Sequence, residues 1–199
     1  MSHLCTNDKS YKKLFKQGLG AGTSCYFTVD PSRQPGEPGG IAVIVGPKWG
    51  TSLLHEQSRT DRSGHGVLTR VRLRTASGFL SIYGTYWPYK PDPSTKSEGS
   101  KKLWNRVHSF CQSDFLQDPD PLLFIQSLID QWMAGDWEDR ADGLVLAGDF
   151  NSRWLPGDHG GQRSLSTWAD ERFVINGPRL IANRGQIEFH TFGRMPTPS

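Results

Sequence analysis

The sequence predicts a mixed α/β fold in which helices pack against a sheet, and three observations support this prediction. Residues 67–74 alternate apolar side chains with others, and a turn signal at 76–78 separates them from a second strand at 79–87, which together predict a hairpin. Apolar residues at helical spacing within 103–111 and 122–132 predict two helices. Strands followed by helices, and then by a further apolar run, are typical of such a sheet.

The segments before the hairpin predict a short helix and two strands. A basic helix is expected at 9–17, ended by glycines that begin at Gly18. A strand is expected at 24–29, then a loop at 31–40 rich in proline and glycine. The continuous apolar run at 41–45 predicts a central strand, because both faces of such a strand must be covered.

The hairpin and the segments after it carry more specific signals. Arg70, Arg72 and Arg74 fall on one face of the first hairpin strand, and a solvated face is favoured there over contact with phosphate. Asp120 followed by Pro121 is a typical helix start. An acidic turn is expected at 135–142 and a short strand at 187–192. No linker divides the chain, so residues 1–199 are expected to form a single domain.

Composition limits the classes of protein to be considered. The 199 residues are 35% hydrophobic, which suffices for one domain with a core, and the net charge of +3 is compatible with a nucleic-acid substrate without indicating one. Cys5, Cys25 and Cys111 form no metal-binding or disulfide pattern, which favours a reducing compartment. No apolar run is long enough to span a membrane and no signal peptide is recognised, so an intracellular protein without a membrane partner is expected.

The most informative stretch is 143–151, which ends in Asp149, Phe150 and Asn151. An apolar run that ends in a carboxylate and a carboxamide two positions apart predicts a buried strand that presents both groups on one face. Such a pair can hold a phosphate oxygen and orient a water molecule. Gly148 would let a substrate backbone come close. The residues alone do not favour this interpretation over an ordinary polar turn after a strand.

Tyrosines at a second expected strand end are further candidates. Tyr86 lies at the end of the segment 79–87, and Tyr89 follows one residue after Pro88. Taken alone, Tyr86 is better explained as a half-buried strand aromatic. The histidines are scattered and form no zinc-binding spacing, and the chain has no P-loop or GxSxG nucleophile motif. The scattered histidines are His55, His65, His159 and His190.

Three blocks, at 39–45, 80–88 and 146–151, occur in an order that resembles the endonuclease/exonuclease/phosphatase superfamily. Within it, the chain is most similar to the apurinic/apyrimidinic-like endonuclease domains of non-LTR retrotransposons, which precede a reverse transcriptase. The resemblance implies a four-layer α/β sandwich of mixed sheets flanked by helices. It also implies hydrolysis of a DNA phosphodiester with Mg²⁺ or Mn²⁺, and a nuclear site of action.

The resemblance assigns roles to particular residues of the chain. Asp149 would activate or orient the attacking water, Asn151 would support the phosphate, and Tyr86 would contact the scissile phosphate. Tyr89 and Arg153 are the expected substrate-binding residues. These roles agree with the chemistry, because attack on an anionic phosphodiester requires its charge to be neutralised by a metal ion and by hydrogen-bond donors.

Two blocks of the family pattern have no counterpart. The Gln-Glu pair that supplies the metal-binding glutamate after an early strand is missing, since none of the early carboxylates (Asp8, Asp30 and Glu37) follows an apolar strand. The terminal Ser-Asp-His block is missing as well. We therefore expect a domain without its first and C-terminal strands, with weak or no activity, because catalytic groups act as a unit. The alternatives are a non-catalytic nucleic-acid-binding remnant and a phosphatase of the same superfamily.

Overall fold

The computed structural model describes residues 13, 17–30, 40–88, 90, 98–114, 119–150 and 168. The chain divides into two compact units, Met1–Gly148 and Asp149–Ser199. The elements below belong to the first unit, except that the last strand ends in Asp149. Most of the expected helix at 9–17 and the expected strand at 187–192 lie outside the described residues. The helical residues 17–19 continue through Gly18 and end before Gly20.

Two short strands form a separate antiparallel sheet. β1 (Ser24–Thr28) pairs with β2 (Ile41–Val45), with Ser24 opposite Val45 and Thr28 opposite Ile41. Both strands were expected. The central position expected for 41–45 is wrong among the described residues, where β2 pairs with β1 alone. Ile44 is 37% exposed.

The larger sheet contains the predicted hairpin at its centre. β4 runs antiparallel to β5, with Leu68 opposite Thr85 and Arg74 opposite Phe79, which confirms the prediction from periodicity. The order of the strands is β3-β4-β5-β6. Their bounds are β3 Arg59–Thr60, β4 Leu68–Arg74, β5 Phe79–Tyr86 and β6 Gly143–Asp149, and two short 3-10 helices, η1 Gly50–Ser52 and η2 His55–Gln57, precede β3.

β6 runs parallel to β5, so the sheet is mixed. At one end, the Asp142 N–H donates to the Phe79 carbonyl oxygen at 2.9 Å. At the other end, a Cβ atom on Gly148 would overlap the Thr85 backbone. Both strands therefore run in the same direction, and their connection passes through two helices, as parallel strands require. Val145 is 42% exposed, so the buried strand expected here is wrong: β6 is the last strand in the described sheet.

The two expected helices are α2 (Glu98–Ser113) and α3 (Pro121–Glu138). Asp120 caps α3 as predicted, because its carboxylate accepts from the Leu122 N–H at 2.7 Å and Pro121 occupies the first turn. The prediction of an acidic turn at 135–142 is wrong for residues 135–138, which belong to α3. The helix continues to Glu138 and ends where Arg140 adopts a φ of 63°.

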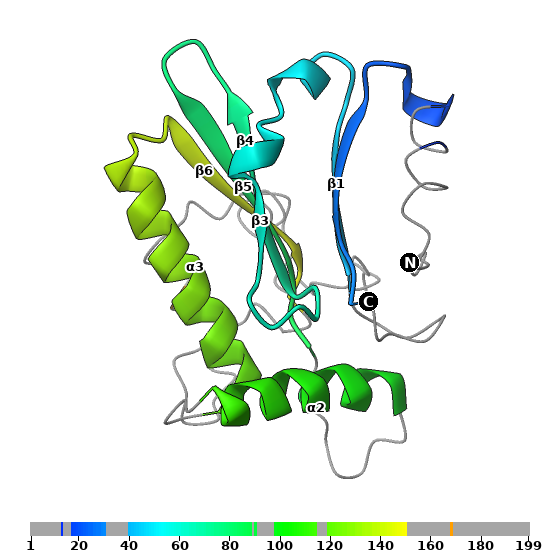
Figure 1. The fold of residues 1–199 in the computed structure, drawn as a ribbon, viewed down its shortest axis with the longest axis vertical. Coiled ribbons are helices and arrows are strands. Elements are labelled where there is room, and N and C mark those ends of the chain that lie inside the picture. The colour runs from blue at the N-terminus through cyan, green and yellow to red at the C-terminus, as the bar shows by residue number, and fades with distance from the viewer. Residues whose placement is uncertain are drawn as a thin grey trace, which may run out of the picture. The chain divides into compact units, whose positions relative to one another are not determined.

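The elements of the first unit form three layers. Val45 and Leu53 pack against Val71 and Leu73, so the β1-β2 sheet covers one face of the hairpin. Figure 1 shows β1 on one side of the larger sheet and α3 on the other. This arrangement confirms the α/β class with a mixed sheet and helices. The part of the chain that the structure describes contains no helix long and apolar enough to cross a membrane.

The helices bury the apolar faces that periodicity predicted. On α2, Leu103, Val107 and Cys111 are fully buried at i, i+4 spacing, which confirms that Cys111 belongs to the core. Burial, together with the nearby carboxylates of Asp120 and Asp114, raises the pKa of the Cys111 thiol to about 11. Cys111 is therefore an uncharged, unreactive thiol at neutral pH.

Candidate functional site

The edge of the larger sheet at which β5 and β6 end, and at which β4 begins, is the candidate site. The Tyr86 N–H donates to the Val67 carbonyl oxygen at 2.9 Å, so the end of β5 lies beside the residue that precedes β4. The close approach of Gly148 to Thr85 brings the end of β6 to the same edge. In open α/β sheets, ligands bind outside the carboxyl ends of parallel strands. We refer to this edge as the strand-end edge.

The structure describes two of the five candidate residues. Tyr86 is the last residue of β5 and is half-buried, and Asp149 is the last residue of β6 and is also half-buried. Each therefore ends a strand, as the sequence predicted. Their roles toward a substrate remain predictions. Tyr89, Asn151 and Arg153 lie outside the described residues.

Gly148 has a different neighbour from the one that we expected. A Cβ atom at this position would overlap the carbonyl oxygen of Thr85 in the adjacent strand. The missing side chain therefore accommodates the backbone of β5, whereas the sequence suggested that it would accommodate a substrate. The close approach of the two backbones explains why glycine stands here.

A buried carboxylate lies two residues after β1. Asp30 is 2% exposed, and its Oδ2 lies 2.8 Å from Nδ1 of His65 and 3.3 Å from Nε of Arg106 on α2. Asp30 follows β1, which ends at Thr28 as the strand expected at 24–29 implies, but β1 begins in Ser24 and ends in Thr28 and is not an apolar run. We call Asp30, His65 and Arg106 the Asp30 cluster.

Local turn geometry explains how His65 reaches Asp30. The turn 61–66 contains Gly64 and Gly66 at positive φ, a conformation that favours glycine. A Cβ atom on Gly66 would lie 2.9 Å from Cα of Gly40, so the turn packs tightly against the residue before β2. The buried Asp61 carboxylate accepts from the Val67 N–H at 3.0 Å and fixes the other end of the turn.

The Asp30 cluster is adjacent to the strand-end edge. His65 lies two residues before Val67, whose carbonyl oxygen accepts hydrogen bonds from the Tyr86 N–H at 2.9 Å and from the Thr85 hydroxyl at 3.0 Å. No local pattern connects the members of this cluster, since Asp30 and His65 are separated by 35 positions and Arg106 lies on a later helix. Only the topology brings the three residues together.

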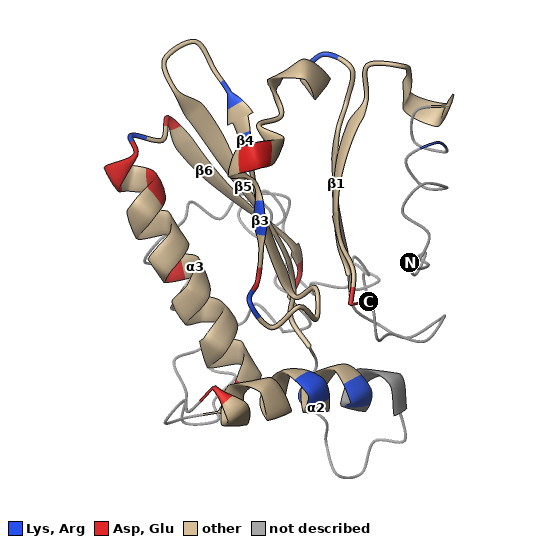
Figure 2. Ribbon diagram, in the orientation of Figure 1, with Lys and Arg blue, Asp and Glu red and all other residues tan. Residues whose placement is uncertain are grey.

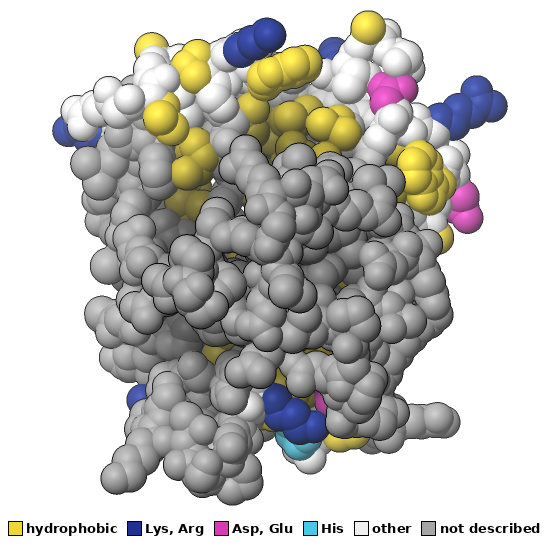
Figure 3. Space-filling model, turned by 180° about the vertical axis from the view of Figure 1, so that it is seen from behind, with side chains coloured by type: hydrophobic (Ala, Val, Ile, Leu, Met, Phe, Trp, Pro, Cys, Tyr) yellow, Lys and Arg dark blue, Asp and Glu magenta, His cyan; other side chains and the backbone are white. Residues whose placement is uncertain are grey.

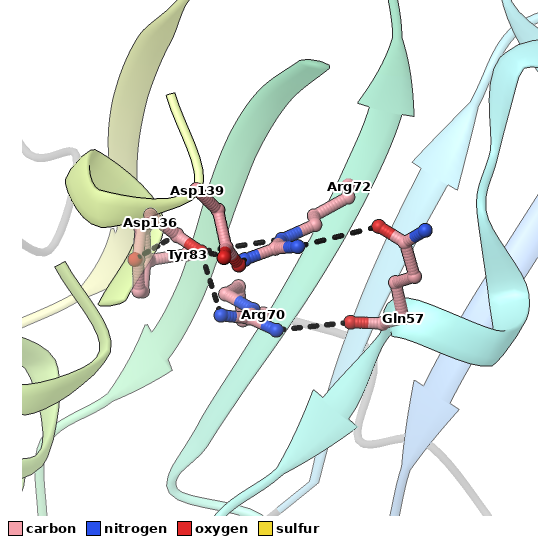
Figure 4. Close-up of polar contacts among 6 residues, drawn as sticks. All are labelled: Gln57, Arg70, Arg72, Tyr83, Asp136 and Asp139. Atoms are coloured by element: carbon pink, nitrogen blue, oxygen red, sulfur yellow. Dashed lines mark hydrogen bonds and ion pairs between the residues drawn. The ribbon is translucent and has the colours of Figure 1, made fainter. Parts of the chain in front are cut away.

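A second ionic cluster lies inside the protein and corrects the prediction for the arginine row. Arg70 and Arg72 were expected on a solvated face, but they are 2% and 7% exposed because α3 covers that face of β4. Arg74 alone of the three is exposed. Nη1 of Arg70 lies 2.7 Å from the Asp136 carboxylate, and Nη2 of Arg72 lies 2.5 Å from it (Figure 4).

Further hydrogen bonds complete this internal cluster. Tyr83 donates its hydroxyl to Asp136, and Arg72 also meets the exposed carboxylate of Asp139 at 2.7 Å. Burial alone would raise the pKa of the Asp136 carboxyl, but the hydrogen bonds from Tyr83 and Arg72 and the charge of Arg70 outweigh it and hold that pKa below its ordinary value. Burial, and then the bond to Asp136, raise the pKa of the Tyr83 phenol. Because Arg70, Tyr83 and Asp136 are buried, we assign this cluster a structural role that joins α3 to the sheet.

The described part of the chain does not contain a complete set of ligands for a magnesium ion. Among those residues, no group of three or more His, Cys, Asp or Glu side chains could hold a metal ion. The Asp30 carboxylate faces two basic side chains, which is the opposite of a cation site. The described residues therefore do not fit the metal that the resemblance implies.

Comparisons with known proteins identified no relative of this chain. No family model, no curated protein and no solved structure matches this chain.

Proposed function

We propose that this chain acts on the phosphodiester backbone of DNA at the strand-end edge, and that the reaction is phosphodiester hydrolysis of the endonuclease type. The observation that supports the proposal most is the parallel pairing of β5 and β6, which brings their carboxyl ends to one edge. A phenol ends one strand at Tyr86 and a carboxylate ends the other at Asp149.

The chemistry of these groups suits a phosphodiester. A phenol can donate a hydrogen bond to a phosphate oxygen, and a carboxylate can accept a proton from an attacking water molecule or orient that molecule. Figure 2 shows basic residues on α2, and Arg106 of this helix meets Asp30 beside the same edge, which favours an anionic ligand. The resemblance to nuclease domains of retrotransposons points to DNA as the polymer.

A second candidate function is DNA binding without cleavage. The observation that favours it is the absence, among the described residues, of a group that could hold a metal ion. No step of our proposal passes through Mg²⁺ for the same reason. The two functions share the same strand-end edge and differ in whether a phosphodiester bond is broken.

Nicking of supercoiled plasmid by the purified chain tests the proposal. We expect slow nicking by the wild-type chain and its loss in Asp149→Ala. Parallel reactions with Mg²⁺ and with EDTA show whether a metal ion takes part. Glu138→Ala is a matched control, because it removes an exposed carboxylate near the start of β6, at the opposite end of that strand. Salt-dependent binding of DNA without nicking would support the second function, and hydrolysis of soluble phosphate esters alone would indicate a phosphatase. If the folded chain neither binds nor cleaves DNA, the proposal fails.

A further inference from the structure

An open depression of about 500 Å³ lies between α2 and the turn that precedes β4. Its lining residues are His65, Asn105, Arg106, Ser109, Phe110 and Ser113. The depression thus includes two of the three members of the Asp30 cluster. The space-filling view shows a histidine and a basic side chain together at the lower end of the surface (Figure 3).

The basic members of the cluster remain open to solvent. The side chains of His65 and Arg106 are 20% and 21% exposed, whereas Asp30 behind them is 2% exposed. The internal Arg70–Asp136 pair is a useful comparison, because its side chains are 2% and 0% exposed and cannot meet a ligand. The Asp30 cluster therefore combines a buried carboxylate with two partly exposed basic side chains.

The carboxylate orients both groups. Nδ1 of His65 faces Asp30 at 2.8 Å, which turns Nε2 away from the carboxylate. Nε of Arg106 faces the same oxygen at 3.3 Å, and Nε and Nη2 of this guanidinium are both buried, so Nη1 is the nitrogen that can meet a ligand from the depression. A charged N–H donor of this kind forms a strong hydrogen bond to a phosphate oxygen.

The exposed face of α2 supplies neutral donors beside the charged ones. Asn105, Ser109 and Ser113 are exposed and recur every four residues, so they form one stripe along the helix. The Ser113 hydroxyl donates to the Phe110 carbonyl oxygen at 2.8 Å, so Asn105 and Ser109 are the neutral donors that the depression offers. Side-chain amides and hydroxyls commonly donate to phosphate oxygens and sugars in protein–DNA complexes. Charged and neutral donors therefore line the same depression.

We propose that the Asp30 cluster and this stripe form a phosphate-binding subsite for a DNA backbone phosphate next to the strand-end edge. The subsite rests on the proposed function in its choice of DNA, since the cluster is joined to that edge through Val67 and Tyr86. Arg106 and His65 bind the phosphate oxygens. Asp30 is a positioning residue that holds both side chains toward the depression.

Binding of a labelled duplex, measured over a series of salt concentrations, tests the subsite with two matched variants. Arg106→Met removes a cation from the depression, and Arg74→Met removes an exposed cation at the opposite end of β4. We expect Arg106→Met to weaken binding about tenfold and to reduce the slope of log affinity against log salt by about 0.9, the value for one lost phosphate contact. Arg74→Met is expected to leave the slope unchanged.

Inorganic phosphate provides a second measurement that does not depend on DNA. We expect phosphate to shift the His65 ring resonances of the wild-type chain in a saturable manner by NMR. The same shift should persist in Arg74→Met and be lost in Arg106→Met. Circular dichroism of each variant establishes that it is folded. If Arg106→Met does not fold, the subsite is tested by the wild-type phosphate titration and by Arg106→Lys, which retains the charge but loses the planar guanidinium.

The outcomes separate the subsite from the proposed function. If phosphate shifts the His65 resonances while the chain binds no DNA, the subsite stands and the proposed function fails. If the chain binds DNA, but Arg106→Met behaves like Arg74→Met and phosphate leaves His65 unmoved, the subsite is overturned and the proposed function stands.

Discussion

Replacement of Asp136 by asparagine should destabilise the protein strongly. This carboxylate is fully buried and accepts hydrogen bonds from Arg70, Arg72 and Tyr83. Asp136→Asn keeps the shape of the side chain and removes its charge. It also places an amide donor opposite one of these donors. Arg72 would keep the exposed carboxylate of Asp139, whereas Arg70 would lose the carboxylate that it meets.

The expected loss of stability follows from the buried charges of Arg70 and Arg72, which remain after the Asp136 carboxylate is removed. Removing one partner of a buried ion pair costs about 3–5 kcal/mol, because the remaining charge stays in a poorly solvated position. The pair of Arg72 with Asp139 gives the scale for a contact whose carboxylate is solvated, since the Asp139 side chain is 57% exposed. Such a pair contributes about 0–1 kcal/mol.

Urea unfolding at pH 7, followed by circular dichroism, measures this difference. We expect the free energy of unfolding to fall by about 3–5 kcal/mol in Asp136→Asn and by less than about 1 kcal/mol in Asp139→Asn. Both variants make the same chemical change at or just beyond the end of α3, so they differ mainly in burial. Equal effects would refute the claim that buried charge joins the helix to the sheet.

Three further predictions concern stability. The pKa of Asp136 is lowered in the folded state, so its contribution to the free energy of unfolding is present above the ordinary carboxyl pKa of 3.8 and is lost as pH falls through the folded-state pKa. The difference in the free energy of unfolding between wild type and Asp136→Asn should therefore become smaller in acid. Gly148→Ala should cost about 1–3 kcal/mol in urea unfolding because its Cβ overlaps Thr85, whereas Gly135→Ala, with open space in α3, should stabilise by up to about 1 kcal/mol. Asp120→Ala should lower the thermal midpoint, through loss of about 1 kcal/mol of helix capping.

Local patterns were sufficient to predict the hairpin and the helices. Strand alternation and the turn at 76–78 involve residues close in sequence, and the structure has the same two strands. The start of α3 at Asp120 and Pro121 was equally accessible, because a cap acts on the N–H groups of its own first turn. These features depend on chemistry within a few residues.

Burial could not be predicted in the same way. Whether Arg70 and Arg72 face solvent depends on α3, whose Asp136 lies 66 and 64 residues further along the chain. An arginine row on a strand is normally solvated, and it becomes internal here because one helical carboxylate meets both side chains. Only the tertiary packing carries that information.

The same distinction between local and long-range signals applies to the candidate site. Strand-end residues Tyr86 and Asp149 were found from sequence, because an apolar run that ends in polar residues is a local signal. The Asp30–His65 pair was missed, because its members come from the end of one strand and the turn before another. The two glycines flanking His65 were the one available hint, since paired glycines favour a tight turn.

Photo-crosslinking tests the central claim, that DNA meets the protein at the strand-end edge. A photoreactive phenylalanine is placed at Tyr86, at the end of β5, or at Ala76, in the turn at the opposite end of the hairpin. Each protein is irradiated with a labelled duplex under the same salt conditions. We predict a crosslink from position 86 and none from position 76. Crosslinking from position 76 alone would contradict the account, because DNA would then bind at the wrong end of the sheet.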